Sequence, residues 1–395
     1  MHKKLAAIIV ALSMTSAALA GCGAAQQAAA PAADAAADSA VDTAESKAEE
    51  TVESTAESAV ESAVESAAET AEEAEVQVTK GEVTYSIDMT QYEKGKVVKV
   101  WLPVAQTNEY QTVDDDPSYD FVQSENIKTE ITTDALGNKM LYVEWSADAE
   151  PADRTGSCSF HAERPEIIAP AEYKEEGTIE GLDLEKYLEP SSTIPVDGVV
   201  KEQADKICEG KETVYDKARA IYDWIYDNMN RDEAVTGCGT GDVCALLDSK
   251  GGKCTDINSV FIGLCRAEGI PAREMFGIRM NADDITKNQH CWAQFYLPGT
   301  GWVSADAADV LKAVLKNEWS KDAAEALETK EYYWGSCDSQ RVELSQGRDV
   351  VLEPAQAGEP LNNFGYPYAE VDGEAIDYYT PDAFVYSISF VADAE

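Results

Sequence analysis

After an alanine-rich beginning, apolar and polar residues alternate along short stretches of the chain. The segment 83–89 alternates strictly, and 96–104 is a β-branched run that ends beside a proline. Residues 128–146 contain two such runs around a turn sequence, which is typical of a β-hairpin. We therefore predict a small antiparallel β-sandwich over residues 79–182, with His161 as a surface or packing residue.

From about residue 183 the periodicity becomes helical. Residues 213–229 place apolar side chains at helical spacing behind Thr213, a suitable N-cap, and 199–210 predicts a shorter helix that ends at a glycine. A third helix is predicted from Cys254 onward. It follows a loop rich in glycine and cysteine at 236–242.

Two further segments of this region read as strands. Residues 290–306 alternate on both sides of the turn sequence PGTG, which predicts a hairpin, and 348–354 predicts another strand. Helices and antiparallel strands in separate runs indicate an α+β fold. We assign residues 183–395 to one domain of helices packed on an antiparallel sheet, with a C-terminal β extension.

Residues 1–21 have the pattern of a bacterial lipoprotein signal. Lys3 and Lys4 form a basic start, 5–12 is an apolar run too short to span a membrane, and Leu-Ala-Gly-Cys ends at Cys22. An ordinary secretory signal followed by a chance cysteine is the alternative. We predict lipidation of Cys22, which would anchor the chain at the extracytoplasmic face of the bacterial cell membrane through two acyl chains.

Residues 22–78 consist mainly of Ala, Glu, Ser and Thr. Glutamates recur every four residues from 49 to 73, so on a helix they would stack on one face and repel one another. Because no apolar stripe is available for burial, we predict a disordered tether that holds the folded part off the membrane.

Composition and charge exclude one class of partner. Hydrophobic residues make up 44% of the chain, enough for a packed core, while the formal net charge is −43. Nucleic acid binding needs a patch of Lys and Arg, and no such patch is visible. We therefore expect no nucleic acid partner.

The chain has nine cysteines. Export permits disulfides, and Cys238 and Cys244 flank a glycine-rich turn and could pair. Neither a CxxC pair nor a histidine-rich cluster occurs, so we do not expect a zinc site.

Cys254 is the candidate nucleophile. Gly251 and Gly252 let the backbone turn tightly just before it, and the apolar positions from 257 to 265 form one helical face after it. A cysteine at a helix N-terminus meets unpaired N–H groups and the helix dipole, which favour a thiolate and could also face an oxyanion. Cys265, within the apolar face, is predicted to be core. The alternative is that Cys254 is itself only a buried thiol.

A thiol nucleophile needs a base, and the chain has three histidines. His2 leaves with the signal and His161 lies in the β-rich region, so His290 is the only candidate for a pair with Cys254. The neighbouring Cys291 points to the opposite face of the strand, and we predict a structural role for it.

Two carboxylates could orient the imidazole of His290. A three-residue turn in the hairpin would put Asp306 diagonal to His290 on the same face of the sheet. A four-residue turn would put Asp309 directly opposite it instead, and periodicity alone does not choose between them.

These segments together resemble the transglutaminase-like superfamily over residues 183–345. The resemblance rests on KCTD at the start of a helix, on RAEGIPAR, and on HCWAQFYLPGTGWVSAD. It implies a papain-like core with Cys254 as nucleophile and His290 as base. The family pattern places the acid four residues after the tryptophan of the second strand, which selects Asp306. A second oxyanion donor is not identified, and Trp224 and Asn228 are candidates by location only.

The resemblance also implies a reaction. A thioester would form on the nucleophile and be resolved by water or an amine. The expected activity is therefore that of a protease, deamidase or transglutaminase acting on peptide or glutamine-type amides, without a metal or an organic cofactor. The expected partner is a protein or peptide substrate at the cell surface. The alternative is a non-catalytic binding or scaffolding lipoprotein, against which the intact Cys, His and Asp set argues.

Overall fold

The computed structural model describes residues 76–177, 183–380 and 382–394. They belong to one compact unit. The predicted signal peptide, Cys22 and most of the predicted tether lie outside the described residues. Within these ranges, no helix combines the length and the apolar character that a membrane span requires.

One sheet of the β-sandwich has the strand order β17-β1-β7-β3, with β4 also paired to β7. Its strands are β1 (Val78–Asp88), β3 (Thr112–Val113), β4 (Ser118–Phe121), β7 (Thr155–Pro165) and β17 (Val385–Ala392). Alternate side chains of β1, namely Val83, Tyr85 and Ile87, are buried in the core of the sandwich. The alternation predicted for this segment is confirmed.

The second sheet has the order β16-β15-β2-β6-β5. Its strands are β2 (Val98–Pro103), β5 (Ile127–Thr133), β6 (Lys139–Trp145), β15 (Tyr368–Val371) and β16 (Glu374–Ala375). The predicted hairpin is confirmed, since β5 and β6 pair from Ile127 opposite Trp145 to Thr133 opposite Lys139.

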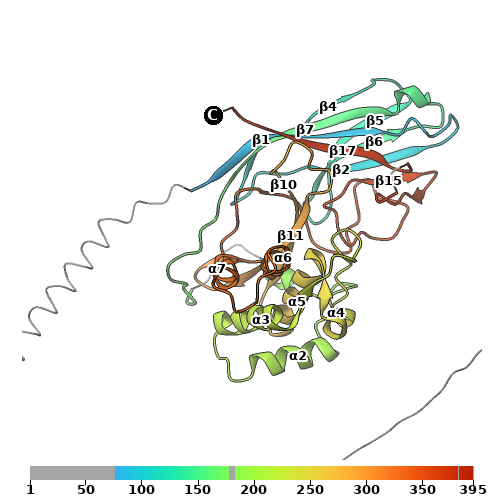
Figure 1. Cartoon of the computed structure of the whole chain (residues 1–395). Coiled ribbons are helices and arrows are strands. Elements are labelled where there is room, and N and C mark those ends of the chain that lie inside the picture. Colours follow the sequence, from blue (N-terminus) through green and yellow to red (C-terminus); the bar gives the residue numbers. More distant parts are fainter. Residues whose placement is uncertain (1–75, 178–182, 381, 395) are drawn as a thin grey trace, which may run out of the picture. The chain divides into compact units, whose positions relative to one another are not determined.

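Strands from the two ends of the described chain share this sandwich (Figure 1). β17 pairs with β1 over its full length, and β15 pairs with β2. Both C-terminal strands lie in the segment predicted as a β extension of the second domain. Their hydrogen bonds are made with the N-terminal strands instead, because the exposed edges of β1 and β2 would otherwise lack partners.

A third sheet, of order β13-β12-β11-β10-β14, supports the helices. Its strands are β10 (Ala272–Arg279), β11 (Gln289–Leu297), β12 (Gly301–Ala305), β13 (Trp334–Gly335) and β14 (Arg341–Gln346). Leu297 pairs with Gly301, so the predicted hairpin forms with a three-residue turn.

The helices are α2 (Gly198–Cys208), α3 (Val214–Asn228), α4 (Val243–Ser249), α5 (Cys254–Ala267), α6 (Ala307–Lys316) and α7 (Ala324–Tyr332). Figure 1 shows α5 beside α3, α4 and β11, all of which it contacts. Short 3-10 helices cover Pro151–Asp153 (η1) and Glu185–Tyr187 (η2), and β8 (Asn230–Arg231) and β9 (Gly251–Gly252) form a small parallel pair.

The structure confirms the α+β fold class and the three predicted helices. Thr213 caps α3 by accepting a hydrogen bond from the Asp216 amide at 3.1 Å. The strand predicted at 348–354 is wrong, since only Val350 bridges to another segment, at Leu361. Val350 and Leu352 instead fill a small core with aromatic side chains of the second sheet, while Val351 is exposed.

Two single substitutions on β17 test whether this strand is part of the core of the sandwich. Ile388 is fully buried opposite Tyr85, whereas Val391 on the same strand is 66% exposed. Ile388→Ala should lower the free energy of unfolding by about 2–5 kcal/mol. Val391→Ala should change it by no more than about 0.5 kcal/mol. Urea unfolding of both variants measures the difference, and equal losses would show that β17 is not part of the cooperative core.

Candidate active site

The N-terminus of α5 is fixed by the glycine-rich loop that precedes it. The carboxylate of Asp256 accepts hydrogen bonds from the amides of Gly241, at 2.8 Å, and Lys253, at 3.0 Å. Gly239 has φ +93°, and a Cβ there would lie 2.0 Å from this carboxylate, so the loop requires glycine. The Thr255 amide donates to the Cys238 carbonyl at 2.9 Å. Together these bonds hold Cys254 as the first residue of the helix.

The whole N-terminal part of α5 is buried, not only its apolar face. Residues 254 to 265 are all buried, including the polar Asn258 and Ser259. Asn258 Nδ2 donates to the Cys291 carbonyl at 2.9 Å and to Asp306 Oδ1 at 3.2 Å. One side chain thus connects the helix that carries Cys254 to β11 and to the start of α6.

The hairpin brings His290 to Asp306. His290 Nε2 lies 2.7 Å from Asp306 Oδ2 and 3.7 Å from Asp309 Oδ1. The three-residue turn therefore selects the diagonal arrangement that the sequence left open. Since an ionised carboxylate only accepts, Nε2 carries the proton of this hydrogen bond and Nδ1 remains available.

Asp306 has further partners that fix its orientation. Its Oδ1 accepts from the Asp309 amide at 3.1 Å and so caps α6, while Arg341 Nη1 donates to Oδ2 at 2.5 Å. Burial alone would raise the pKa of Asp306, but His290 and Arg341 outweigh it and lower that pKa. The carboxylate is thus held in its charged form inside the protein.

A buried ionic cluster surrounds the imidazole. Arg341 contacts Asp306, Asp309 and Asp338, and Arg279 contacts the last two. Three carboxylates therefore face two guanidinium groups, and the cluster is electrically balanced only when the imidazole is protonated. Neither arginine is among the predicted site residues, because nothing in the local pattern of the two strands that carry them points to the site.

The same charges act on His290. Burial alone would lower the pKa of His290, but the negative charges of Asp309 and Asp306 outweigh burial and the two arginines, so this pKa is raised. The imidazolium form therefore persists to a higher pH than in an exposed histidine.

Cys254 and His290 line the same cavity, which has a volume of about 780 Å³. Its cationic side chains are Arg231, Lys253, Arg279, Lys287 and Lys312, and its one carboxylate is Glu233. Its aromatic wall comes from the C-terminal part of the chain: Tyr366, Tyr378, Tyr379, Phe384 and Tyr386. A positive cavity in a chain of net charge −43 sets this site apart from the rest of the molecule.

The oxyanion candidates taken from location alone are wrong. Neither Trp224 nor Asn228 lines the cavity. Lys250 lies over the Trp224 ring, and Asn228 donates to the Trp224 carbonyl. Gln289, beside His290, does line the cavity, and within the described ranges its buried Nε2 has no hydrogen-bond partner.

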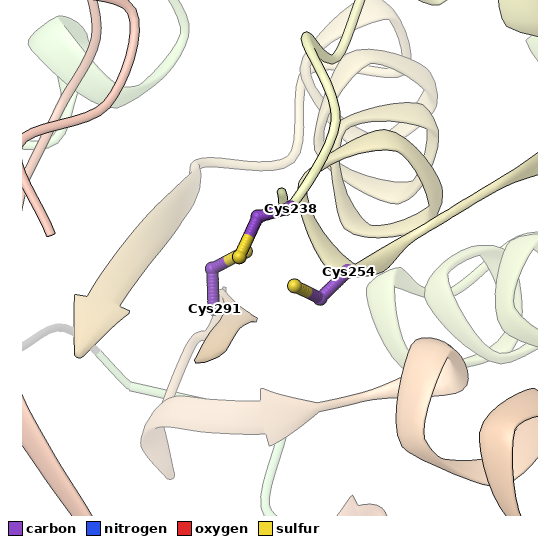
Figure 2. Close-up of side chains that lie close together, drawn as sticks. All are labelled: Cys238, Cys254 and Cys291. Atoms are coloured by element: carbon purple, nitrogen blue, oxygen red, sulfur yellow. The ribbon is translucent and has the colours of Figure 1, made fainter. Parts of the chain in front are cut away.

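Three cysteines meet at the edge of this cavity (Figure 2). The sulfurs of Cys238, Cys254 and Cys291 lie within 4.8 Å of one another. Cys291 Sγ is 3.1 Å from Thr255 Oγ1, so it points toward α5 and away from Asp306. The predicted facing of Cys291 is thus confirmed, and its sulfur does not line the cavity.

The other cysteines and His161 lie elsewhere. Cys238 and Cys244 are both free, the first buried and the second exposed, so the predicted pair does not form. Cys265 is fully buried in the helical core, as predicted. His161 is about one-third exposed and lies 3.1 Å from Asp393, which agrees with a surface role.

Comparisons with known proteins assign a family. The family model of the transglutaminase-like superfamily matches residues 201–307, a range that holds Cys254, His290 and Asp306. The chain belongs to the transglutaminase-like superfamily. This transglutaminase-like chain is also 36% identical over 331 residues to an uncharacterised protein of Haemophilus influenzae, covering 77% of this chain and 88% of that protein.

Two solved structures are similar to this transglutaminase-like chain. A candidate cysteine protease from Cytophaga hutchinsonii is 20% identical, with a TM-score of 0.47 over 80% of this chain and 98% of that one. The periplasmic domain of TgpA from Pseudomonas aeruginosa is 16% identical, with a TM-score of 0.31 over 64% of this chain and 93% of that one. Both TM-scores are below 0.5, so family membership rests on the sequence match.

The ionic cluster predicts how His290 titrates. Asp309→Asn removes one of the charges that raise the pKa of His290 but leaves the bond to Asp306, so this pKa should fall. NMR titration of the imidazole signals measures it, with His161→Gln to assign them. In the wild type, stabilisation by imidazolium formation is fully present below the ordinary histidine pKa of about 6.5 and is lost as pH rises through the raised value. An unchanged His290 pKa in Asp309→Asn would contradict the assigned cause.

Proposed function

We propose that this protein is a thiol enzyme that acts on peptide or glutamine-type amides through a thioester on Cys254. The observation that carries the proposal is the shared cavity: Cys254, at a helix N-terminus, and His290, hydrogen-bonded to Asp306, both face it. A nucleophile, a base and a group that orients the base are the three parts that such chemistry needs.

In the proposed reaction the sulfur of Cys254 attacks the amide carbonyl carbon. The thiol proton passes to Nδ1 of His290, which then gives it to the leaving amine, so the C–N bond breaks as the thioester remains. The amide N–H of Cys254, at the first position of α5, is available to the oxyanion because such amides have no partner within the helix.

The ionic cluster would support the charged state of the base. During the attack the imidazole becomes an imidazolium, and this is the form in which three carboxylates and two guanidinium groups are balanced. Asp306 cannot rotate away, because Asn258, Arg341 and the N-terminus of α6 all hold it. The protein thus meets the charge of the intermediate without rearrangement.

The lining of the cavity favours an acidic substrate. Lys287 and Lys312 have no ion-pair partner among the described residues, while Glu233 pairs with both Arg231 and Lys253. Unpaired cations at a cavity attract carboxylates near the reacting amide, and this attraction weakens as salt is added.

The proposal includes the place where the enzyme acts. A lipid on Cys22 would anchor the chain to the extracytoplasmic face of a bacterial membrane, and residues 23–78 would carry the catalytic part to protein or peptide substrates at the surface. The lipoprotein pattern of residues 1–22 supports this part of the proposal.

Alkylation tests the nucleophile. With iodoacetamide near neutral pH, Cys254 should be modified first among the cysteines, because it lines the same cavity as the proposed base His290. His290→Ala should slow this modification. Cys265 provides the matched control, since it lies on the same helix but is fully buried. Peptide mapping by mass spectrometry gives each rate, and equally slow labelling of Cys254 and Cys265 would argue against a catalytic thiol.

Substrate turnover tests the reaction. A library of carboxamide peptides, incubated with and without a primary amine, should yield cleaved, deamidated or cross-linked products, with acidic peptides preferred at low salt. Asp306→Asn should reduce kcat by about 10²–10⁴-fold, because the imidazole loses its orienting acceptor. If Cys254 labels rapidly but no peptide is turned over, a non-catalytic binding module becomes the better account.

A further inference from the structure

Three thiols from separate segments meet where the proposed reaction uses only one. Cys238 comes from the glycine-rich loop, Cys254 from the start of α5 and Cys291 from β11 (Figure 2). They are 6%, 4% and 2% exposed, and all are free. Burial of three unpaired sulfurs within 4.8 Å of one another calls for a function that involves all of them.

We propose that Cys238, Cys254 and Cys291 together bind one thiophilic metal ion, Zn²⁺ in the first instance. Tetrahedral zinc with Zn–S bonds of about 2.3 Å places its sulfurs about 3.8 Å apart. The observed spacing of these sulfurs, within 4.8 Å, needs little or no adjustment to reach that value. Sulfur ligands select Zn²⁺ or Cu⁺ over Mg²⁺ and Ca²⁺, which prefer oxygen.

The position of the three sulfurs provides an entry path. Cys238 and Cys254 line the cavity, while Cys291 does not and lies behind them. An ion would therefore enter from the cavity, and a water molecule or a small anion from the cavity would complete its coordination. Three protein ligands with one remaining position is the arrangement in which zinc keeps an exchangeable ligand.

Two hydroxyl groups are placed to orient the sulfurs. Tyr366 Oη lies 3.1 Å from Cys238 Sγ, and Thr255 Oγ1 lies 3.1 Å from Cys291 Sγ. A thiolate can only accept a hydrogen bond, so both hydroxyls would donate once the sulfurs bind an ion. Hydrogen bonds to the ligands of a metal fix their direction and raise its affinity.

The charges around the cysteines favour ionised sulfur. Three thiolates around a divalent ion leave one excess negative charge, and Arg231 and Lys253 line the same cavity. Each thiol that is still protonated releases its proton to solvent as the ion binds, so affinity should increase with pH.

Metal binding and amide chemistry would exclude one another. A sulfur of Cys254 that ligates an ion cannot attack a carbonyl carbon. This consequence rests on the proposed function, whereas the site itself does not. The bound ion would act as a reversible block on the enzyme, removed by a chelator.

Cadmium titration tests the site, because Cd²⁺ binds thiolates and gives an ultraviolet thiolate-to-metal absorption band. In the purified chain with a non-thiol reductant, we expect one Cd²⁺ per chain, displaced by Zn²⁺. Cys238→Ser, Cys254→Ser and Cys291→Ser should each weaken binding by more than the roughly 10–100-fold that loss of an outer hydrogen-bond partner costs. Cys244→Ser is the matched control, since Cys244 is exposed, and should bind as the wild type does.

A second measurement does not depend on the variants folding. In the wild type, one equivalent of Zn²⁺ should protect Cys238 and Cys254, the two thiols that line the cavity, from alkylation together while leaving Cys244 reactive. Sub-stoichiometric binding, protection of Cys254 alone, or unchanged binding in a folded Cys291→Ser variant would overturn the three-sulfur site. Alkylation of Cys254 without metal tests the proposed function separately, so either proposal can fail while the other stands.

Discussion

The buried carboxylate of Asp306 is the interaction on which the candidate site depends. It accepts hydrogen bonds from His290 on β11, Asn258 on α5, Arg341 on β14 and the first turn of α6. Four elements that are distant in sequence are thus held by one side chain. A buried charge without partners strongly lowers the free energy of unfolding. The fold therefore depends on keeping all of these partners together.

The charges around this carboxylate favour one protonation state of His290, the imidazolium. Replacing such a buried ionic cluster with apolar side chains often stabilises a protein, so stability alone does not account for it. The cluster leaves one negative charge unbalanced when His290 is neutral, which is the condition that raises its pKa. The cluster thus stabilises the imidazolium form of His290, which lies at the wall of a cavity lined mainly by cationic and aromatic side chains.

Local patterns predicted those parts of the structure that local forces determine. The periodicity of α3 and α5, the β11–β12 hairpin, and the scarcity of histidine were enough to single out Cys254 and His290. Only the strand register shows the three-residue turn that selects Asp306. The resemblance to the transglutaminase-like superfamily pointed to the same residue. Local patterns did not predict contacts between residues that are far apart in the sequence. Examples are the pairing of β17 with β1, the two arginines around Asp306, and the approach of Cys291 to Cys238. A search for short cysteine motifs therefore predicted no metal site, although the fold assembles three sulfurs from separate segments.

The most direct test of the central claim is to trap the acyl intermediate. The protein would be mixed with an activated ester of a glutamine-type side chain, quenched in acid within its first turnover, and analysed by peptide mass spectrometry. The account predicts one acyl group per chain, carried by the peptide that contains Cys254 and absent from Cys254→Ala. An acyl group on Cys238, or no acylated cysteine at all, would contradict it.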